Sequence, residues 1–176
     1  YKKFIYERYS YRLSNNDLEI FFNFQIPPNI SFNPKIIIKN VDKKQIKKIG
    51  LSAEASAKAG DRVLDNLIFH LGLMEIPSYW KATCSPEIVV KAGHLNKEQI
   101  RWWKDLIIKG MGQFFYENKI NFKKQNFLKI SSAFGNRQGP VLCQLKKRGL
   151  VAVGGGKDSA VTLEILRRTR KNVKCF

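Results

Sequence analysis

A glycine-rich segment near the end of the sequence combines residue types that suit the binding of an anion. It reads Gly154-Gly155-Gly156-Lys157-Asp158-Ser159 and stands between an apolar run at residues 150–153 and an amphipathic run at residues 160–169. The first run predicts a short buried strand and the second predicts a helix. Glycines before a helix let an anion approach unpaired backbone N–H groups, where the helix dipole also favours negative charge. We therefore expect a phosphate-binding turn between this strand and this helix.

Two common phosphate-binding motifs do not fit this segment. The P-loop of nucleotide hydrolases needs a lysine where Gly155 stands, followed by Ser or Thr. The dinucleotide fingerprint needs a third glycine where Ser159 stands, and too few residues follow to supply its ribose-binding acid. The segment instead resembles the pyrophosphate loop of the N-type ATP pyrophosphatases (the PP-loop superfamily), Ser-Gly-Gly-x-Asp-Ser, with Gly154 in place of the first serine.

This resemblance implies a site for ATP and Mg²⁺ at which a substrate is adenylated. It assigns backbone donors to Gly155 and Gly156, a hydroxyl donor to Ser159, and to Asp158 a carboxylate for the Mg²⁺ that bridges the phosphates. Lys157 would neutralise phosphate charge or simply face solvent. The structural alternative is a tight strand-to-helix turn whose glycines serve only packing.

A second segment combines aromatic rings, a lysine and a thiol between two prolines. It reads Ile76-Pro77-Ser78-Tyr79-Trp80-Lys81-Ala82-Thr83-Cys84-Ser85-Pro86 and leads into a predicted strand at residues 87–91. Further along stand Trp102-Trp103 and Gly110-Met111-Gly112-Gln113-Phe114-Phe115-Tyr116-Glu117-Asn118. Together with the glycine loop, and in this order, these segments resemble the family of UDP-N-acetylmuramoyl-L-alanyl-L-glutamate epimerases over most of residues 60–170.

That resemblance implies an ATP-dependent isomerase of peptidoglycan precursor synthesis, acting in the bacterial cytoplasm during cell wall biogenesis. Its substrate is a UDP-N-acetylmuramoyl dipeptide whose terminal L-glutamate becomes D-glutamate. An ionised α-carboxylate makes the neighbouring proton very hard to remove, because the resulting enolate would carry two negative charges. Converting the carboxylate to an acyl-adenylate releases pyrophosphate and makes that proton far more acidic, and later hydrolysis releases AMP.

Tyr79, Lys81 and Cys84 are the candidates for moving the proton. A lysine or thiol whose pKa is shifted toward neutrality can act as a base, and its counterpart as an acid. Each candidate also has a structural interpretation. Tyr79 would belong to the core or stack on substrate, Lys81 would contact a phosphate or carboxylate, and Cys84 would be a small buried hydrophobe. The residues alone leave this choice open.

The net charge of +18 is compatible with two interpretations. It results from 32 Lys and Arg against 14 Asp and Glu, spread over nearly every segment, which is typical of a lysine-rich composition with solvated faces. The other interpretation is a polyanionic partner, either a phosphorylated small molecule or a nucleic acid. A PP-loop enzyme that modifies tRNA by thiolation is thus the alternative to the epimerase, although no cysteine pair that could carry a persulfide is present. A basic binding module without activity would leave the glycine loop unexplained.

The remaining sequence predicts an α+β domain over residues 1–148 that positions these segments. Runs of β-branched and aromatic residues at 4–13 and 18–26, the second with alternating apolar residues, indicate a hairpin, and three isoleucines at 36–38 indicate another strand. Helices are expected over residues 43–49, from about residue 56 to 74 with Pro77 as the stop, and over 97–109. Residues 114–118 read as strand or loop, 127–130 as a possible strand and 135–140 as a loop. The buried helical positions are predicted to be Val63, Leu64, Leu67, Ile68, Leu71, Ile100, Trp103, Leu106 and Ile107. The helix expected over residues 160–169 carries the apolar residues Val161, Leu163, Ile165 and Leu166.

Residues 149–176 predict the first strand–helix unit of a second domain, an α/β, Rossmann-like domain that binds adenine nucleotides, with its next strand at 172–176. The chain of 176 residues is 44% hydrophobic, which is enough for a core in about one domain and part of another. We find no membrane-spanning run and no signal peptide. Cys84, Cys143 and Cys175 form no C-x-x-C pair, so we expect reduced thiols and a cytoplasmic protein. Because Tyr1 rather than Met opens the chain, we also expect it to be incomplete.

Overall fold

The computed structural model describes residues 1–42, 44, 59–132, 149–169 and 173–175. The chain divides into two compact units, Tyr1–Val141 and Leu142–Phe176. The first is a mixed α+β unit, and the second contains two strands and a helix. The helix expected over residues 43–49, apart from residue 44, and the loop expected over 135–140 lie outside the described residues.

Two long strands, β1 (Lys3–Ser14) and β2 (Asp17–Ile26), form the antiparallel hairpin that the alternating sequence predicts. Asn15 and Asn16 connect them with positive φ angles of 49° and 67°, as the favoured two-residue hairpin turn requires. Every second residue of β2 from position 18 to 26 is buried. One face of the hairpin therefore belongs to the core, and the other carries mostly polar side chains.

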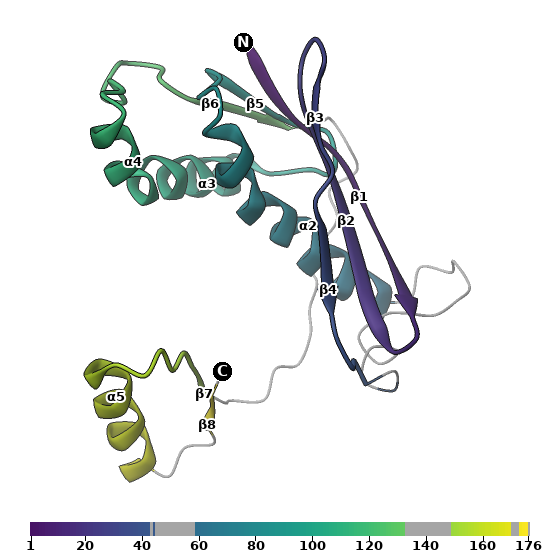
Figure 1. Cartoon of the computed structure of the whole chain (residues 1–176), viewed down its shortest axis with the longest axis vertical. Helices are drawn as coiled ribbons and strands as arrows, with labels where there is room; N and C mark the ends of the chain where they lie inside the picture. Colours follow the sequence, from purple (N-terminus) through teal and green to yellow (C-terminus); the bar gives the residue numbers. More distant parts are fainter. Residues whose placement is uncertain (43, 45–58, 133–148, 170–172, 176) are drawn as a thin grey trace. The chain divides into compact units, whose positions relative to one another are not determined.

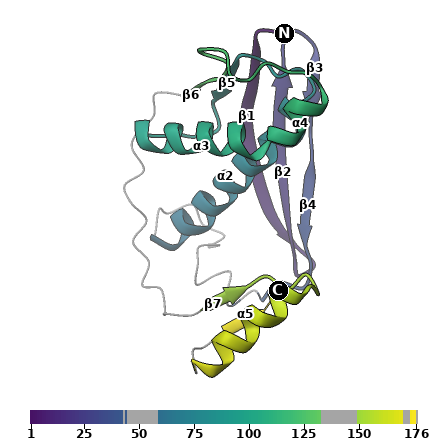
Figure 2. The ribbon, with the colours of Figure 1, turned by 90° about the vertical axis from the view of Figure 1, so that its left-hand side faces the viewer.

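Two short strands, β3 (Ile30–Phe32) and β4 (Lys35–Ile38), pair antiparallel with β2. Pro27 and Pro28 end the hairpin as expected, but β3 follows them directly and was not predicted from the sequence. The strand of three isoleucines is confirmed as part of β4. Because β3 and β4 pair with the same side of β2, they form one border of the sheet, where Figure 2 shows β4.

Helix α2 (Ala59–Trp80) runs past Pro77, where the sequence predicts its end. A proline inside a helix removes one hydrogen bond and crowds the preceding turn. Ile76 and Trp80 on either side of it are 2% and 0% exposed, so tertiary packing offsets this cost. The buried stripe is confirmed for Leu64 and Ile68, whereas Leu67 is 57% exposed. Since each residue turns the helix by about 100°, Leu67 lies outside the face that the other two present to the sheet.

The elements β5 (Glu87–Val90), α3 (Lys97–Gly110), α4 (Gly112–Glu117) and β6 (Lys129–Ser132) complete the first unit. Strands β5 and β6 and helix α3 are confirmed within a few residues, including burial of Trp103 and Ile107, while Leu106 is 36% exposed. The prediction of strand or loop for residues 114–118 is wrong, because four of these five residues belong to α4. Phe115 at the centre of α4 is 0% exposed, so packing of this ring outweighs the strand preference of aromatic residues.

The first unit has two layers, with helices on one face of a six-stranded mixed sheet. The strand order is β3-β2-β1-β5-β6, with β4 beside β2, and β1, β5 and β6 run parallel to one another. Helix α2 packs on β1 and β2 and helix α3 packs on β6, on the same side of the sheet in Figures 1 and 2. A β-bulge between Tyr6 and Arg8 separates the parallel-paired start of β1 from its remainder. The core lies between the two layers.

The described residues of the second unit form β7 (Gly149–Val151), α5 (Lys157–Arg168) and β8 (Val173–Cys175), with β7 and β8 parallel. This confirms the predicted succession of strand, glycine turn, helix and strand. The helix begins at Lys157, earlier than the sequence predicts, because Gly156 already has the extended backbone of a helix N-cap. Of the apolar residues that this helix carries, Val161 and Ile165 are 57% and 58% exposed. A sheet of two short strands is too small to cover the helix.

Candidate phosphate-binding loop and proton-transfer residues

The glycine turn between β7 and α5 leaves its backbone open to a ligand. Gly155 has a φ angle of +78°, a left-handed conformation that other residues rarely adopt. Cβ atoms built at Gly154, Gly155 and Gly156 meet no atom within 4 Å among the described residues. The packing explanation for these glycines therefore finds no support in the part of the chain that the structure describes.

The first turn of α5 adds polar groups to the glycine turn. Gly156 is the N-cap, and the described residues provide no side-chain hydrogen bond to this cap. The Gly154 N–H donates to the Ser159 hydroxyl oxygen at 3.3 Å. Because that hydroxyl accepts here, its own hydrogen remains able to bond a further acceptor. The arrangement offers backbone and hydroxyl donors of the kind that phosphate oxygens accept.

The charged residues of the loop fit the same ligand. Lys157 and Asp158 are both exposed in the first helical turn. Among the described residues no group of three or more His, Cys, Asp and Glu side chains could hold a metal ion. Asp158 could thus supply one protein ligand to Mg²⁺, an ion that commonly takes one or two carboxylates together with phosphate oxygens and water.

The lysine- and cysteine-containing segment is a helix end and not an open loop. The Lys81 N–H donates to the Pro77 carbonyl at 3.3 Å, and the Cys84 N–H donates to the Trp80 carbonyl at 2.9 Å. Cys84 closes the turn with a φ angle of +45°, and the Trp80 indole donates to the Ser85 carbonyl at 2.8 Å. These bonds fix the path from α2 into β5.

The Cys84 thiol contacts the backbone of Lys81, whereas the Tyr79 ring packs on other aromatic rings. The Cys84 thiol donates to the Lys81 carbonyl at 3.8 Å, and burial raises its pKa, which favours the neutral thiol. Lys81 is exposed. The Tyr79 ring packs on Phe24 and Phe32 at centroid separations of 5.3 and 5.1 Å. Burial, followed by the charge of Glu75, raises the Tyr79 pKa. Of the three candidates, only Lys81 presents its side chain largely to solvent.

A polar group that the sequence analysis did not single out lies at the opposite ends of these strands. Lys81 and Cys84 precede β5, whereas Glu7 and Lys91 follow the parallel segments of β1 and β5 and stand 2.9 Å apart. Glu7 Oε2 is buried and forms no hydrogen bond of good geometry with any described residue, so its contact with Lys91 is an ion pair. In open sheets with parallel strands, ligands bind beyond the carboxyl ends. Only the β1–β5 pairing reveals this group, because the two residues are far apart in the sequence.

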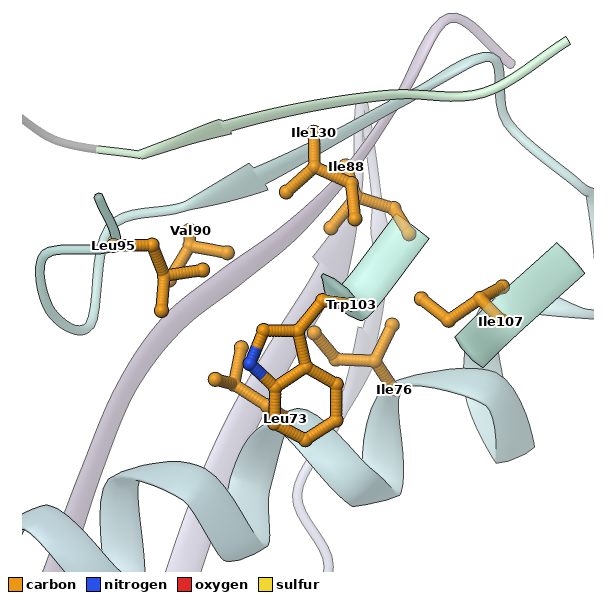
Figure 3. A pocket seen from close by; sticks show the side chains of 8 residues that line it. All are labelled: Leu73, Ile76, Ile88, Val90, Leu95, Trp103, Ile107 and Ile130. Atoms are coloured by element: carbon orange, nitrogen blue, oxygen red, sulfur yellow. The ribbon is translucent and has the colours of Figure 1, made fainter. Parts of the chain in front are cut away.

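A small cavity in the core is not a substrate site. Its volume is about 10 Å³, which is roughly enough for one water molecule. Figure 3 shows its lining side chains, which are aliphatic apart from the indole of Trp103: Leu73, Ile76, Ile88, Val90, Leu95, Trp103, Ile107 and Ile130. A cavity of this size is too small for a nucleotide or a sugar.

Fold and site together define an α+β domain followed by a strand–glycine turn–helix–strand unit. Comparison with known families matches residues 1–176 to the family described as the MurL N-terminal domain. The chain belongs to this family. None of its described helices is long and apolar enough to span a membrane.

The chain is also similar to UDP-N-acetyl-alpha-D-muramoyl-L-alanyl-L-glutamate epimerase of Xanthomonas oryzae pv. oryzae (strain MAFF 311018). The two are 32% identical over 90 residues, which are 51% of this chain and 20% of that protein. The match thus covers only a fifth of the length of the curated relative. No solved structure matches the chain.

Proposed function

We propose that the protein containing this chain epimerises the terminal L-glutamate of UDP-N-acetylmuramoyl-L-alanyl-L-glutamate to D-glutamate, with consumption of ATP. The observation that carries the proposal is the match of the MurL N-terminal domain family along residues 1–176. The relative from Xanthomonas oryzae, named as this epimerase, supports it. The reaction would place the protein in peptidoglycan precursor synthesis in the cytoplasm.

The second part of the proposal is that residues 149–176 begin the ATP-binding domain of this enzyme. The open glycine turn and the parallel β7–α5–β8 unit support it. Backbone N–H groups of Gly155 and Gly156 and the Ser159 hydroxyl would hold phosphate oxygens, Lys157 would offset their charge, and Asp158 would bind Mg²⁺. ATP would supply the phosphorus atom that activates the α-carboxylate of the substrate, with release of pyrophosphate and finally AMP.

The third part concerns the proton. Lys81 is our first candidate, because its amino group is exposed beside a turn that hydrogen bonds hold in place. Cys84 and Tyr79 are candidates for the acid that returns a proton to the glutamate Cα, since burial favours their protonated forms. Inversion at the glutamate Cα requires a base on one side of this carbon and an acid on the other.

The test uses the complete protein with Mg²⁺, ATP and the UDP-linked dipeptide in D₂O. We expect AMP, pyrophosphate and D-glutamate, the last resolved by chiral chromatography after acid hydrolysis, with deuterium at Cα. Failure to form AMP and D-glutamate would overturn the proposal. Ser159→Ala should slow the formation of AMP, pyrophosphate and D-glutamate alike. A variant that has lost a proton-transfer residue should retain ATP–pyrophosphate exchange and lose deuterium incorporation.

A second function is favoured by one observation, the net charge of +18. The same loop would then activate a base of tRNA, whose phosphates the lysines would attract. Replacing the dipeptide by tRNA in the same assay distinguishes the two. AMP formation with tRNA alone would favour the tRNA-modifying enzyme over the epimerase.

A further inference from the structure

Within the described residues, strand β4 presents an apolar edge that pairs with no further strand, at the border of the sheet. It pairs with β2 on one side, and no described strand pairs with its other side (Figure 2). Ile37 and Ile38 are 42% and 45% exposed. An exposed edge of β-branched residues offers its free N–H and C=O groups to a further strand.

The pairing of β4 with β2 determines which backbone groups are free. The Phe22 N–H donates to the Pro34 carbonyl at 3.1 Å, so these two residues form a hydrogen-bonded pair. Such pairs alternate along an antiparallel ladder, which directs the backbone groups of Ile36 and Ile38 toward β2 as well. The backbone groups of Lys35 and Ile37 consequently point away from the sheet.

The edge sequence is self-complementary. Lys35-Ile36-Ile37-Ile38-Lys39 reads the same in both directions. A two-fold axis at its centre would pair Ile37 with Ile37 of a second copy and Ile36 with Ile38 of that copy. Pairs of β-branched residues across neighbouring strands stabilise a sheet, and the free groups of Ile37 would form both bonds of a hydrogen-bonded pair.

The flanking lysines do not oppose this pairing as edge lysines ordinarily do. Lys35 forms an ion pair with Glu19 at 2.7 Å, and Lys39 forms one with Asp17 at 2.7 Å. Both carboxylates belong to β2 of the same chain. A two-fold arrangement that sets Lys35 opposite Lys39 therefore brings together two lysines that each have a carboxylate partner, although Lys35 shares Glu19 with Arg12.

We propose that this chain forms a two-fold symmetric dimer through antiparallel pairing of β4 with β4 of a second copy. The two sheets would then continue into one another across the axis at Ile37. Because the paired edges are short, the dimer would be weak and dependent on concentration.

Disulfide trapping tests the register. In a background with Cys84, Cys143 and Cys175 replaced by serine, Ile37→Cys would meet itself across the axis. The Cα atoms of a hydrogen-bonded antiparallel pair are about 5.5 Å apart, which a disulfide can span. We expect a covalent dimer for Ile37→Cys and its loss for the control Ile36→Cys, whose counterpart is an isoleucine. Equal cross-linking of both variants, or none for Ile37→Cys, would overturn the proposal.

Sedimentation of the unmodified chain over a range of concentrations tests the association itself. We expect a dimer that Ile37→Lys abolishes, since it would place two lysines on the axis. Leu67→Lys, which introduces the same charge at an exposed apolar position of α2, should leave the dimer intact. A chain that stays monomeric throughout, or a dimer that survives Ile37→Lys, contradicts the proposed interface.

Discussion

The ring of Tyr6 lies directly against the backbone of Gly72. A Cβ atom at position 72 would stand 2.1 Å from the Tyr6 hydroxyl oxygen and 2.5 Å from Cζ of the same ring. The ring is fully buried, and its hydroxyl has no hydrogen-bond partner among the described residues. This close approach brings α2 against the centre of the sheet.

Gly72→Ala should therefore destabilise the domain. The added methyl group would collide with a packed ring, and overpacking of this kind costs about 1–3 kcal/mol. Urea unfolding followed by circular dichroism measures the change. Gly110→Ala is the matched control, because a Cβ at position 110 meets nothing within 4 Å. Tyr6→Phe should be neutral or stabilising, since it removes a buried hydroxyl without a partner. Equal effects of the two glycine substitutions would contradict the importance of the close approach.

Adjacent tryptophans in α3 provide a second pair of variants. Trp103 is 5% exposed and lines the core cavity in Figure 3, whereas Trp102 is 58% exposed. Trp103→Ala should lower the free energy of unfolding by about 3–5 kcal/mol, because it enlarges the cavity. Trp102→Ala should change it by no more than about 0.5 kcal/mol. The same unfolding titration compares them, and a comparable loss for both would show that α3 does not pack as described.

The start of α3 depends on a reciprocal cap. The Gln99 N–H donates to Asn96 Oδ1 at 2.8 Å, and the Asn96 N–H donates to Gln99 Oε1 at 2.9 Å. Asn96→Ala removes the first bond and should cost about 0.5–2 kcal/mol in thermal or urea unfolding. Asn96→Asp retains an acceptor and should restore most of the stability. No recovery with aspartate would mean that the cap contributes little.

The ion pairs on the open face of the sheet give a dependence on pH. Lys35 and then Arg12 lower the pKa of the Glu19 carboxyl below its usual value of 4.5. A lowered folded-state pKa contributes stability that is present above the unfolded pKa and is lost as the pH falls through the folded one. The difference in melting temperature between wild type and Glu19→Gln should thus be constant near neutral pH and shrink below pH 4.5. Concentrated salt should reduce it at neutral pH, and a difference that grows in acid would have the wrong sign.

The glycine turn before α5 should respond to substitution position by position. Gly155→Ala places a side chain at a φ angle of +78°, whereas Gly154→Ala meets neither a positive φ angle nor a neighbour within 4 Å. We expect Gly155→Ala to weaken nucleotide binding by the complete protein more than Gly154→Ala, as measured by calorimetry with Mg²⁺ and ATP. The reverse order would argue against a role for the left-handed turn in holding phosphate.

Most of the correct fold predictions rest on local patterns in the sequence. The β1–β2 hairpin follows from alternation with a two-residue turn, and the β7–α5–β8 unit follows from an apolar run, glycines and an amphipathic run. Pro77 misled the prediction because its cost is offset by the burial of Trp80, which depends on residues distant in sequence. Phe115 misled it in the same way, since an aromatic run suits a strand until tertiary packing selects a helix.

The same distinction between local sequence and tertiary packing applies to the candidate site. The glycine loop consists of consecutive residues, so the sequence alone was enough to recognise it. The turn that ends at Cys84, and with it the raised pKa of the thiol, depends on the hydrogen bonds and burial of the folded chain. The pairing of Glu7 with Lys91 depends on the parallel register of β1 and β5 and cannot be recognised from either segment alone.

The central strand β1 has neighbours from very different parts of the chain, which determines the order of assembly during synthesis. Its antiparallel partner β2 is complete at Ile26, so the hairpin can close almost as soon as it leaves the ribosome. Its parallel partner β5 begins only at Glu87, after α2 has been made. The apolar face of the hairpin is covered only once α2, which packs on β1 and β2, has been made. Closure of this long loop, and not formation of the hairpin, should limit the folding rate of the domain.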